Sequence, residues 1–141
     1  MKTLKTLLAA VLMVVSFNAL ADEESKKEKL GVDYALKTYI DAISDGKVKG
    51  LSEVVDRDAK FTLTRRDQVL SFTKSEILTS LKKNEEVQQN CETTYQLLDL
   101  AGNQAVYKVI MKYADFSKIN MVTINNTGRG WKITNVSSSF Q

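Results

Sequence analysis

Apolar residues in the first half of the chain repeat with the spacing of a helix. They fall three and four positions apart and mark one face of a helix about three turns long: Val32, Ala35, Leu36, Tyr39, Ile40 and Ile43. Asp45-Gly46 predicts its end. A shorter second helix is predicted over Val48 to Val55, although Gly50 weakens it by about 1 kcal/mol relative to Ala.

A capping pattern introduces the third helix. In Thr73-Lys74-Ser75-Glu76 the first side chain accepts a hydrogen bond from the fourth amide, and the fourth side chain reaches back to the first amide. This predicts a helix over Ser75 to Lys83, with Ile77, Leu78 and Leu81 facing inward. Before it, β-forming residues predict a short hairpin with strands at Asp58 to Leu63 and Gln68 to Phe72.

The second half of the chain reads as strands separated by short turns. Four are predicted: Cys91 to Leu100, Gln104 to Tyr113, Lys118 to Asn125 and Trp131 to Phe140. Such spacing is typical of an antiparallel meander. The expected fold class is therefore α+β, in which about three N-terminal helices pack on one face of a curved antiparallel sheet made of the short hairpin and the four-stranded meander.

The N-terminus has the pattern of a secretory signal peptide over residues 1–21. Lys2 and Lys5 precede an uncharged apolar run, and Ala19-Leu20-Ala21 is a small-x-small cleavage site. We expect a cut after Ala21, a charged flexible leader over residues 22–30 and one domain over residues 31–141. The protein is then periplasmic or secreted, without stable membrane association after cleavage. The alternative is a retained N-terminal anchor helix.

Composition narrows the chemistry. Loss of Lys2 and Lys5 with the signal lowers the net charge of +3 by two, and no basic stripe with aromatic residues remains, so nucleic-acid binding is not expected. The chain has no histidine, which removes the usual general base and a common metal ligand. Its single cysteine, Cys91, excludes an internal disulfide. We interpret it as a mostly buried side chain in a strand, with a reactive thiol or an intermolecular bridge as alternatives.

Four stretches of the chain are similar to a known superfamily. They are Asp56 to Phe61, Thr73 to Leu78, Leu100 to Val109 and Gly130 to Asn135. With the order of elements, they resemble the nuclear transport factor 2-like superfamily of cone-shaped α+β domains, and within it the lumazine-binding-like group of small bacterial exported proteins. The likeness spans roughly Val32 to Phe140. The matched residues are packing and turn residues, so the resemblance indicates fold more than activity.

The resemblance implies two classes of function. The superfamily includes enzymes such as ketosteroid isomerase and small dehydratases, and also non-catalytic binding or dimerising modules. In the isomerase pattern a carboxylate base stands late in the first strand, where this chain has Thr62, Leu63 and Thr64. We therefore expect an exported, non-catalytic small-molecule-binding or protein-interaction module. The alternative is an isomerase or dehydratase that uses Tyr and Asp in the cone pocket.

Aromatic and sulfur-containing side chains are the candidates for lining that pocket. Seven are predicted to line it: Tyr39, Tyr95, Tyr107, Met111, Phe116, Met121 and Trp131. They suit a small apolar or aromatic ligand, and ordinary core packing is the alternative for each. We predict no catalytic residue, metal ligand or cofactor. A homodimer through the sheet is the further expected partner.

Three aspartates form the most plausible carboxylate cluster. Asp56 and Asp58 flank a predicted turn, and Asp67 follows the first strand. Carboxylate oxygens suit a hard cation such as Ca²⁺, but the spacing of the EF-hand calcium loop is absent. The interpretation we favour is that these are turn-forming, solvated carboxylates.

Overall fold

The computed structural model describes Lys27 and residues 30–141. The predicted signal peptide and nearly all of the predicted leader lie outside the described residues. Within the described part of the chain, no helix combines the length and the apolar character needed to cross a membrane.

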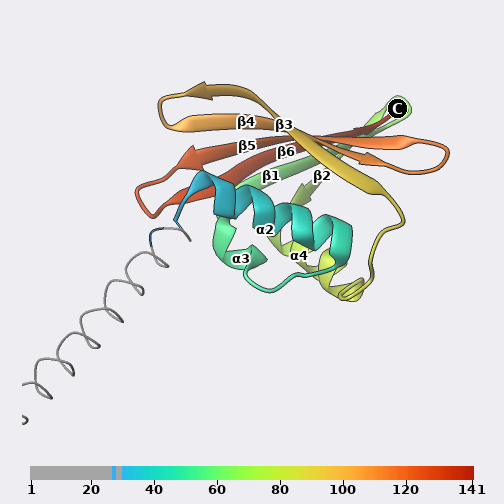
Figure 1. The fold of residues 1–141 in the computed structure, drawn as a ribbon, viewed down its shortest axis with the longest axis horizontal. Helices are drawn as coiled ribbons and strands as arrows, with labels where there is room; N and C mark the ends of the chain where they lie inside the picture. The colour runs from blue at the N-terminus through green and yellow to red at the C-terminus, as the bar shows by residue number, and fades with distance from the viewer. Residues whose placement is uncertain (1–26, 28–29) are drawn as a thin grey trace, which may run out of the picture.

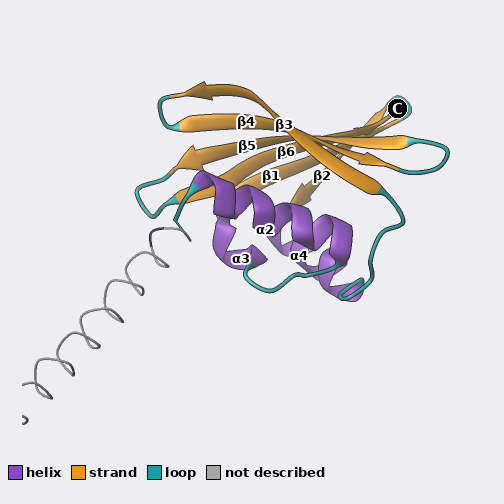
Figure 2. Ribbon diagram, in the orientation of Figure 1, coloured by secondary structure: helices purple, strands orange, loops and turns teal. Residues whose placement is uncertain are grey.

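Helices come first along the described chain and a meander comes last, as the hydrophobic pattern predicts. The elements are α2 (Val32–Asp45), α3 (Leu51–Val54), β1 (Val55–Arg65), β2 (Gln68–Thr73), α4 (Lys74–Lys83), β3 (Glu92–Ala101), β4 (Gln104–Lys112), β5 (Ser117–Asn126) and β6 (Trp131–Phe140). The helices cover one face of a curved, open sheet (Figures 1 and 2). The predicted α+β class is confirmed.

The sheet differs from the expected one in one pairing. Its strand order is β2-β1-β6-β5-β4-β3, and β1 runs parallel to β6 while all other neighbours are antiparallel. The hairpin and the meander therefore join through a parallel pair, and the sheet is mixed rather than wholly antiparallel. Short turns fix the direction of neighbouring strands, but β1 and β6 are separated by α4 and the whole meander, so no local signal sets theirs.

The first helix forms and ends as its sequence predicts. Leu36 and Tyr39 are buried against the sheet, as the spacing of apolar residues requires. The helix ends at Gly46, which adopts a left-handed backbone with φ of 70°. A Cβ atom there would lie 2.7 Å from the backbone nitrogens of Glu86 and Val87, so the loop after α4 packs directly on this glycine.

The second helix is shorter than predicted, mainly because it begins at Leu51, after Gly50 in a left-handed conformation, and it ends at Val54, where the chain continues into β1. Two lysine side chains bind carbonyl groups where the helix ends. Lys74 Nζ donates to the carbonyl oxygens of Ser52 and Val55 at 2.7 and 2.8 Å, and Lys132 Nζ donates to that of Glu53 at 2.6 Å. Cations at a helix C-terminus satisfy its orphan carbonyls and complement its dipole. These contacts fix α3 to α4 and β6.

The third helix, α4, has the predicted capping box. Glu76 N donates to Thr73 Oγ1 at 3.3 Å, and Thr73 N donates to Glu76 Oε1 at 3.2 Å. The inward residues Ile77, Leu78 and Leu81 are half-buried and pack against the core, and no residue of this helix is fully buried. The helix therefore covers one end of the sheet without sealing it.

The core lies between α2 and the alternate residues of the central strands that face it. On β4 and β5 these include Tyr107, Val109, Val122 and Ile124, all buried. On β6 the alternation changes phase, because an extra residue at Thr134 shifts the register and both Ile133 and Val136 are buried. The same bulge brings Ser138, two residues after Val136, onto the face that the helices cover.

Candidate functional site

A cavity of about 140 Å³ lies between α2, α4 and the covered face of the sheet. Most of its wall is apolar, and each of the surrounding layers contributes to it. The lining residues are Tyr39 and Ile43 of α2, Phe61, Thr62 and Leu63 of β1, Phe72 of β2, Ile77, Ser80 and Leu81 of α4, Lys118 of β5 and Ser138 of β6. Concave, mostly apolar sites with a few polar groups are typical of small-molecule binding.

A buried polar pair supports the sheet side of this cavity. Asn120 and Ser138 are direct antiparallel partners on β5 and β6, so their side chains leave the sheet on the same face. Ser138 Oγ donates to Asn120 Oδ1 at 2.6 Å, and Asn120 Nδ2 donates to the carbonyl oxygen of Val109 at 3.4 Å. The fully buried amide is therefore satisfied, and it fixes the position of the Ser138 hydroxyl at the cavity wall.

The two ionisable groups of the cavity wall are both affected by desolvation. Burial lowers the pKa of the Lys118 ammonium, because a charged amine loses hydration there. Burial raises the pKa of the Tyr39 hydroxyl for the same reason, so the phenol stays neutral well into the alkaline range. Among the described residues, the one ion pair joins Arg57 to Asp58, and Lys118 takes no part in it.

The seven predicted pocket residues do not share one cavity. Tyr39 lines the interior cavity. Tyr95 and Tyr107 lie on β3 and β4 as an edge-to-face pair with ring centroids 6.4 Å apart, but the Tyr95 side chain is 63% exposed. The pKa of Tyr107 is raised, first by burial and then by the charges of Asp33 and Tyr95. Neither tyrosine lines the cavity, and the influence of the Asp33 charge places Tyr107 near the N-terminal part of α2.

The other four candidates lie in four different places. Met111 is buried on β4, and Trp131 lines a separate hollow on α2. Phe116, in the loop between β4 and β5, stacks on Tyr113 with centroids 4.6 Å apart and touches Phe140 edge-on at 5.9 Å. Met121 alternates with the buried residues of β5 and therefore lies on the opposite, uncovered face of the sheet.

The hollow that contains Trp131 is larger, about 830 Å³, but its chemistry is different. It lies along the side of α2 and carries charges of both signs, from Asp33, Lys37, Asp41, Lys47 and Lys49. A surface of scattered, opposite charges remains hydrated and offers no single recognition element. The cavity between α2, α4 and the sheet is the better candidate site.

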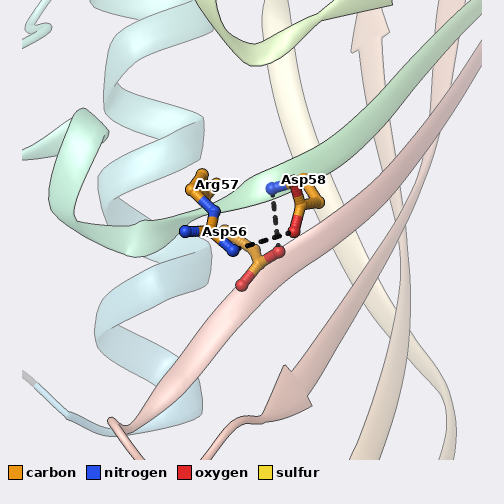
Figure 3. Close-up of polar contacts among 3 residues, drawn as sticks. All are labelled: Asp56, Arg57 and Asp58. Atoms are coloured by element: carbon orange, nitrogen blue, oxygen red, sulfur yellow. Dashed lines mark hydrogen bonds and ion pairs between the residues drawn. The ribbon is translucent and has the colours of Figure 1, made fainter.

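The three aspartates are not brought together. Asp56 and Asp58 lie at the start of β1, where Asp58 N donates to Asp56 Oδ2 at 3.0 Å and Asp58 pairs with Arg57 at 3.7 Å (Figure 3). Asp67 follows the far end of the strand, about 30 Å away at the usual rise per residue. Within the described residues, no three His, Cys, Asp or Glu side chains are placed to hold a metal ion.

Sequence reasoning missed Lys118 and Ser138. One signal for Lys118 was present: it stands in phase with Val122 and Ile124, two residues before Asn120, on the apolar side of the strand. Ser138 had no such signal, because the bulge in β6 reverses the phase that Trp131 and Ile133 establish. Cys91 is half-buried, one residue before β3, with its sulfur 3.6 Å from Thr93 Oγ1.

Comparison with known proteins gives a family and a fold. Residues 27–140 match the sequence profile of the family described as "Putative lumazine-binding". No curated protein matches the chain.

Solved structures with the same fold come from several bacteria. A protein from Methylobacillus flagellatus has a TM-score of 0.64 at 16% identity, covering 85% of this chain and 93% of its own. One from Shewanella baltica has a TM-score of 0.62 at 9% identity, covering 86% and 95%. One from Silicibacter pomeroyi has a TM-score of 0.61 at 14% identity, covering 78% and 91%. All three are described as NTF2-like proteins of unknown function, so the likeness is one of fold.

Proposed function

The chain belongs to the lumazine-binding-like family of the nuclear transport factor 2-like superfamily, and from that membership and the interior cavity we propose that it is an exported, non-catalytic module that binds a small apolar or aromatic molecule. The observation that carries the proposal is the cavity itself. Its walls are apolar on several sides, and its volume is close to the about 150 Å³ that holds benzene in a protein core, although this cavity opens to solvent.

The absence of a carboxylate from the cavity wall supports binding over isomerase-type chemistry. Such chemistry needs a general base within hydrogen-bond reach of the substrate. No Asp or Glu of the described residues lines the cavity, and none of them is buried. Thr62 and Leu63 are present where the catalytic relatives have their base, so the proposal assigns no catalytic role.

A cavity-filling variant tests the proposal. Neutral aromatic probes of increasing size, namely benzyl alcohol, indole and lumazine, are titrated into the protein and followed by amide chemical shifts and thermal midpoints. Ile77→Phe adds bulk to a cavity-lining position on α4 and is expected to abolish binding. Leu78→Phe, at the next half-buried position of the same helix but outside the lining, should retain it. The proposal fails if no probe binds, or if both variants bind as the unmodified protein does.

Export is tested separately, because it depends on residues outside the described structure. We propose that the chain is cleaved after Ala21 and reaches the periplasm or the medium. Intact-mass measurement of the full-length gene product, expressed in a Gram-negative host and released by osmotic shock, should give a chain that begins at Asp22. A chain that keeps residues 1–21 and sediments with membranes would contradict cleavage after Ala21 and favour the retained anchor.

A further inference from the structure

We propose that the cavity is selective for an anionic ligand, a small aromatic or branched aliphatic monocarboxylate whose carboxylate pairs with Lys118 Nζ while its apolar part fills the space between β1, β2 and α4. This inference rests on the proposed binding function and specifies the ligand class of the same site.

The position of Lys118 is the first step. It lies near the start of β5, on the face that the helices cover, in phase with the buried residues Asn120 and Val122. Its antiparallel partner is Phe140, whose side chain leaves the sheet on the same face. The amine therefore extends into the apolar layer rather than out from the free face, where lysines such as Lys108 stand.

The charge of the cavity wall is the second step. Of its lining residues, only Lys118 and Tyr39 ionise, and burial keeps the phenol neutral. No lining residue is acidic, so the ammonium has no counterion inside the cavity. Burying an unpaired charge is unfavourable, and burial accordingly lowers the pKa of Lys118. A ligand carboxylate would supply the missing partner through a charge-assisted hydrogen bond, which is among the stronger polar contacts in proteins.

Size and charge count set the ligand class. About 140 Å³ accommodates a single ring or a short branched chain. The wall away from the amine is apolar and includes Phe61, Phe72 and Leu81, which suit the body of such a molecule. One cation favours one carboxylate, because a second would be buried without a partner.

The test uses a matched pair of probes, benzoate and its uncharged near-isostere benzamide, with affinities measured by calorimetry at pH 7. The unmodified protein should bind benzoate at least about tenfold more tightly than benzamide. Lys118→Met should weaken benzoate binding by about tenfold or more and leave benzamide binding unchanged. Lys108→Met, which removes a lysine from the opposite face of the neighbouring strand, should alter neither affinity.

The outcomes separate this inference from the proposed function. Benzamide binding equal to benzoate binding in the unmodified protein would overturn the inference without recourse to any variant. An undiminished benzoate affinity in Lys118→Met would overturn it as well. If neither probe binds and the neutral aromatic series also fails, the proposed binding function itself is wrong. The thermal midpoint of Lys118→Met should equal or exceed that of the unmodified protein, because the substitution removes a partly desolvated charge that has no counterion in the cavity wall.

Discussion

At the scale of single residues, the interior depends on a few polar groups that are fully satisfied. Asn120 is completely buried, and its amide is held by Ser138 on one side and by the carbonyl of Val109 on the other. Within the described part of the chain, no fully buried side-chain nitrogen or oxygen lacks a partner. Because the environment is apolar, removing one member of this pair exposes the other to the full cost of an unmade hydrogen bond.

Ser138→Ala should therefore lower the free energy of unfolding by about 1–2 kcal/mol, since it leaves Asn120 Oδ1 buried without a donor. Urea unfolding followed by circular dichroism measures the change. Ser139→Ala makes the same chemical change on the opposite face of β6 and should cost less than about 0.5 kcal/mol. Equal effects of the two substitutions would show that the buried pair contributes nothing specific.

Tyr39 gives the protein a pH dependence in the alkaline range. Its pKa is raised by burial in the folded state, whereas in the unfolded chain it is about 10. Above that pH the unfolded state loses the proton and the folded state keeps it, so stability that is fully present below about pH 10 falls as the pH rises. Tyr39→Phe removes this contribution and should flatten the decline between pH 10 and 11 by up to about 1.4 kcal/mol per pH unit. Urea unfolding at pH 9, 10 and 11 measures the slope, and identical slopes for both proteins would refute the assignment.

At the scale of elements, contacts at the ends of the helices hold neighbouring elements together. The loop after α4 is attached to the end of α2, where Glu86 N donates to the carbonyl oxygen of Gly46 at 2.9 Å. Gly46 has to be left-handed and has no room for a side chain. Gly46 thus lets the loop that follows α4, the helix at one wall of the cavity, pack closely against the end of α2.

A pair of glycine substitutions separates backbone strain from steric contact. Gly102, in the turn between β3 and β4, is also left-handed, but a Cβ atom there would meet nothing within 4 Å. Gly102→Ala should therefore cost about 1–2 kcal/mol from backbone conformation alone. Gly46→Ala adds a clash with backbone atoms at 2.7 Å and should cost at least about 2 kcal/mol more. Thermal or urea unfolding of both variants gives the comparison, and similar costs would argue that the loop moves away freely.

The elements also show what sequence can predict and where it stops. The helical spacing from Val32 and the capping box at Thr73 are local signals, and both appear in the structure as predicted. The late start of the second helix at Leu51 was not predicted, because Gly50 was expected only to weaken the helix, whereas its left-handed backbone stands before the first turn. The aromatic residues of the candidate site were chosen by type, and type does not tell which face of a strand a bulge will present.

At the scale of the whole molecule, the free face of the sheet carries apolar and polar side chains together. Val106, Ile110, Ile119 and Met121 alternate with the core residues of β4 and β5, and Ile110 and Ile119 are direct antiparallel partners. Lys108 stands between Val106 and Ile110 and directly opposite Met121, so the apolar residues of this face are interrupted by a charge. The homodimer through the sheet stays a prediction, and this face is its candidate interface.

We expect the protein to dimerise at micromolar concentration through this face. Met121→Glu places a charge at its centre and should shift the dimer to monomer by an order of magnitude or more in dissociation constant. Thr64→Glu, an exposed position on β1 near the other edge of the sheet, serves as the control and should leave the equilibrium unchanged. Sedimentation equilibrium measures both. An unmodified protein that stays monomeric up to about 100 µM would contradict the expected dimerisation.

The position of β6 has a consequence for how the chain folds as it is made. This last strand in chain order stands between β1 and β5, and its pairing with β1 joins residues about 75 positions apart, such as Phe61 and Val136. A ribosome therefore has to deliver residues up to 140 before the two halves of the sheet can be joined. Until then β1 exposes an unpaired edge, and the cavity lacks the wall that Ser138 supplies. The junction between the two halves of the sheet therefore forms only after β6 has been synthesised, long after β1.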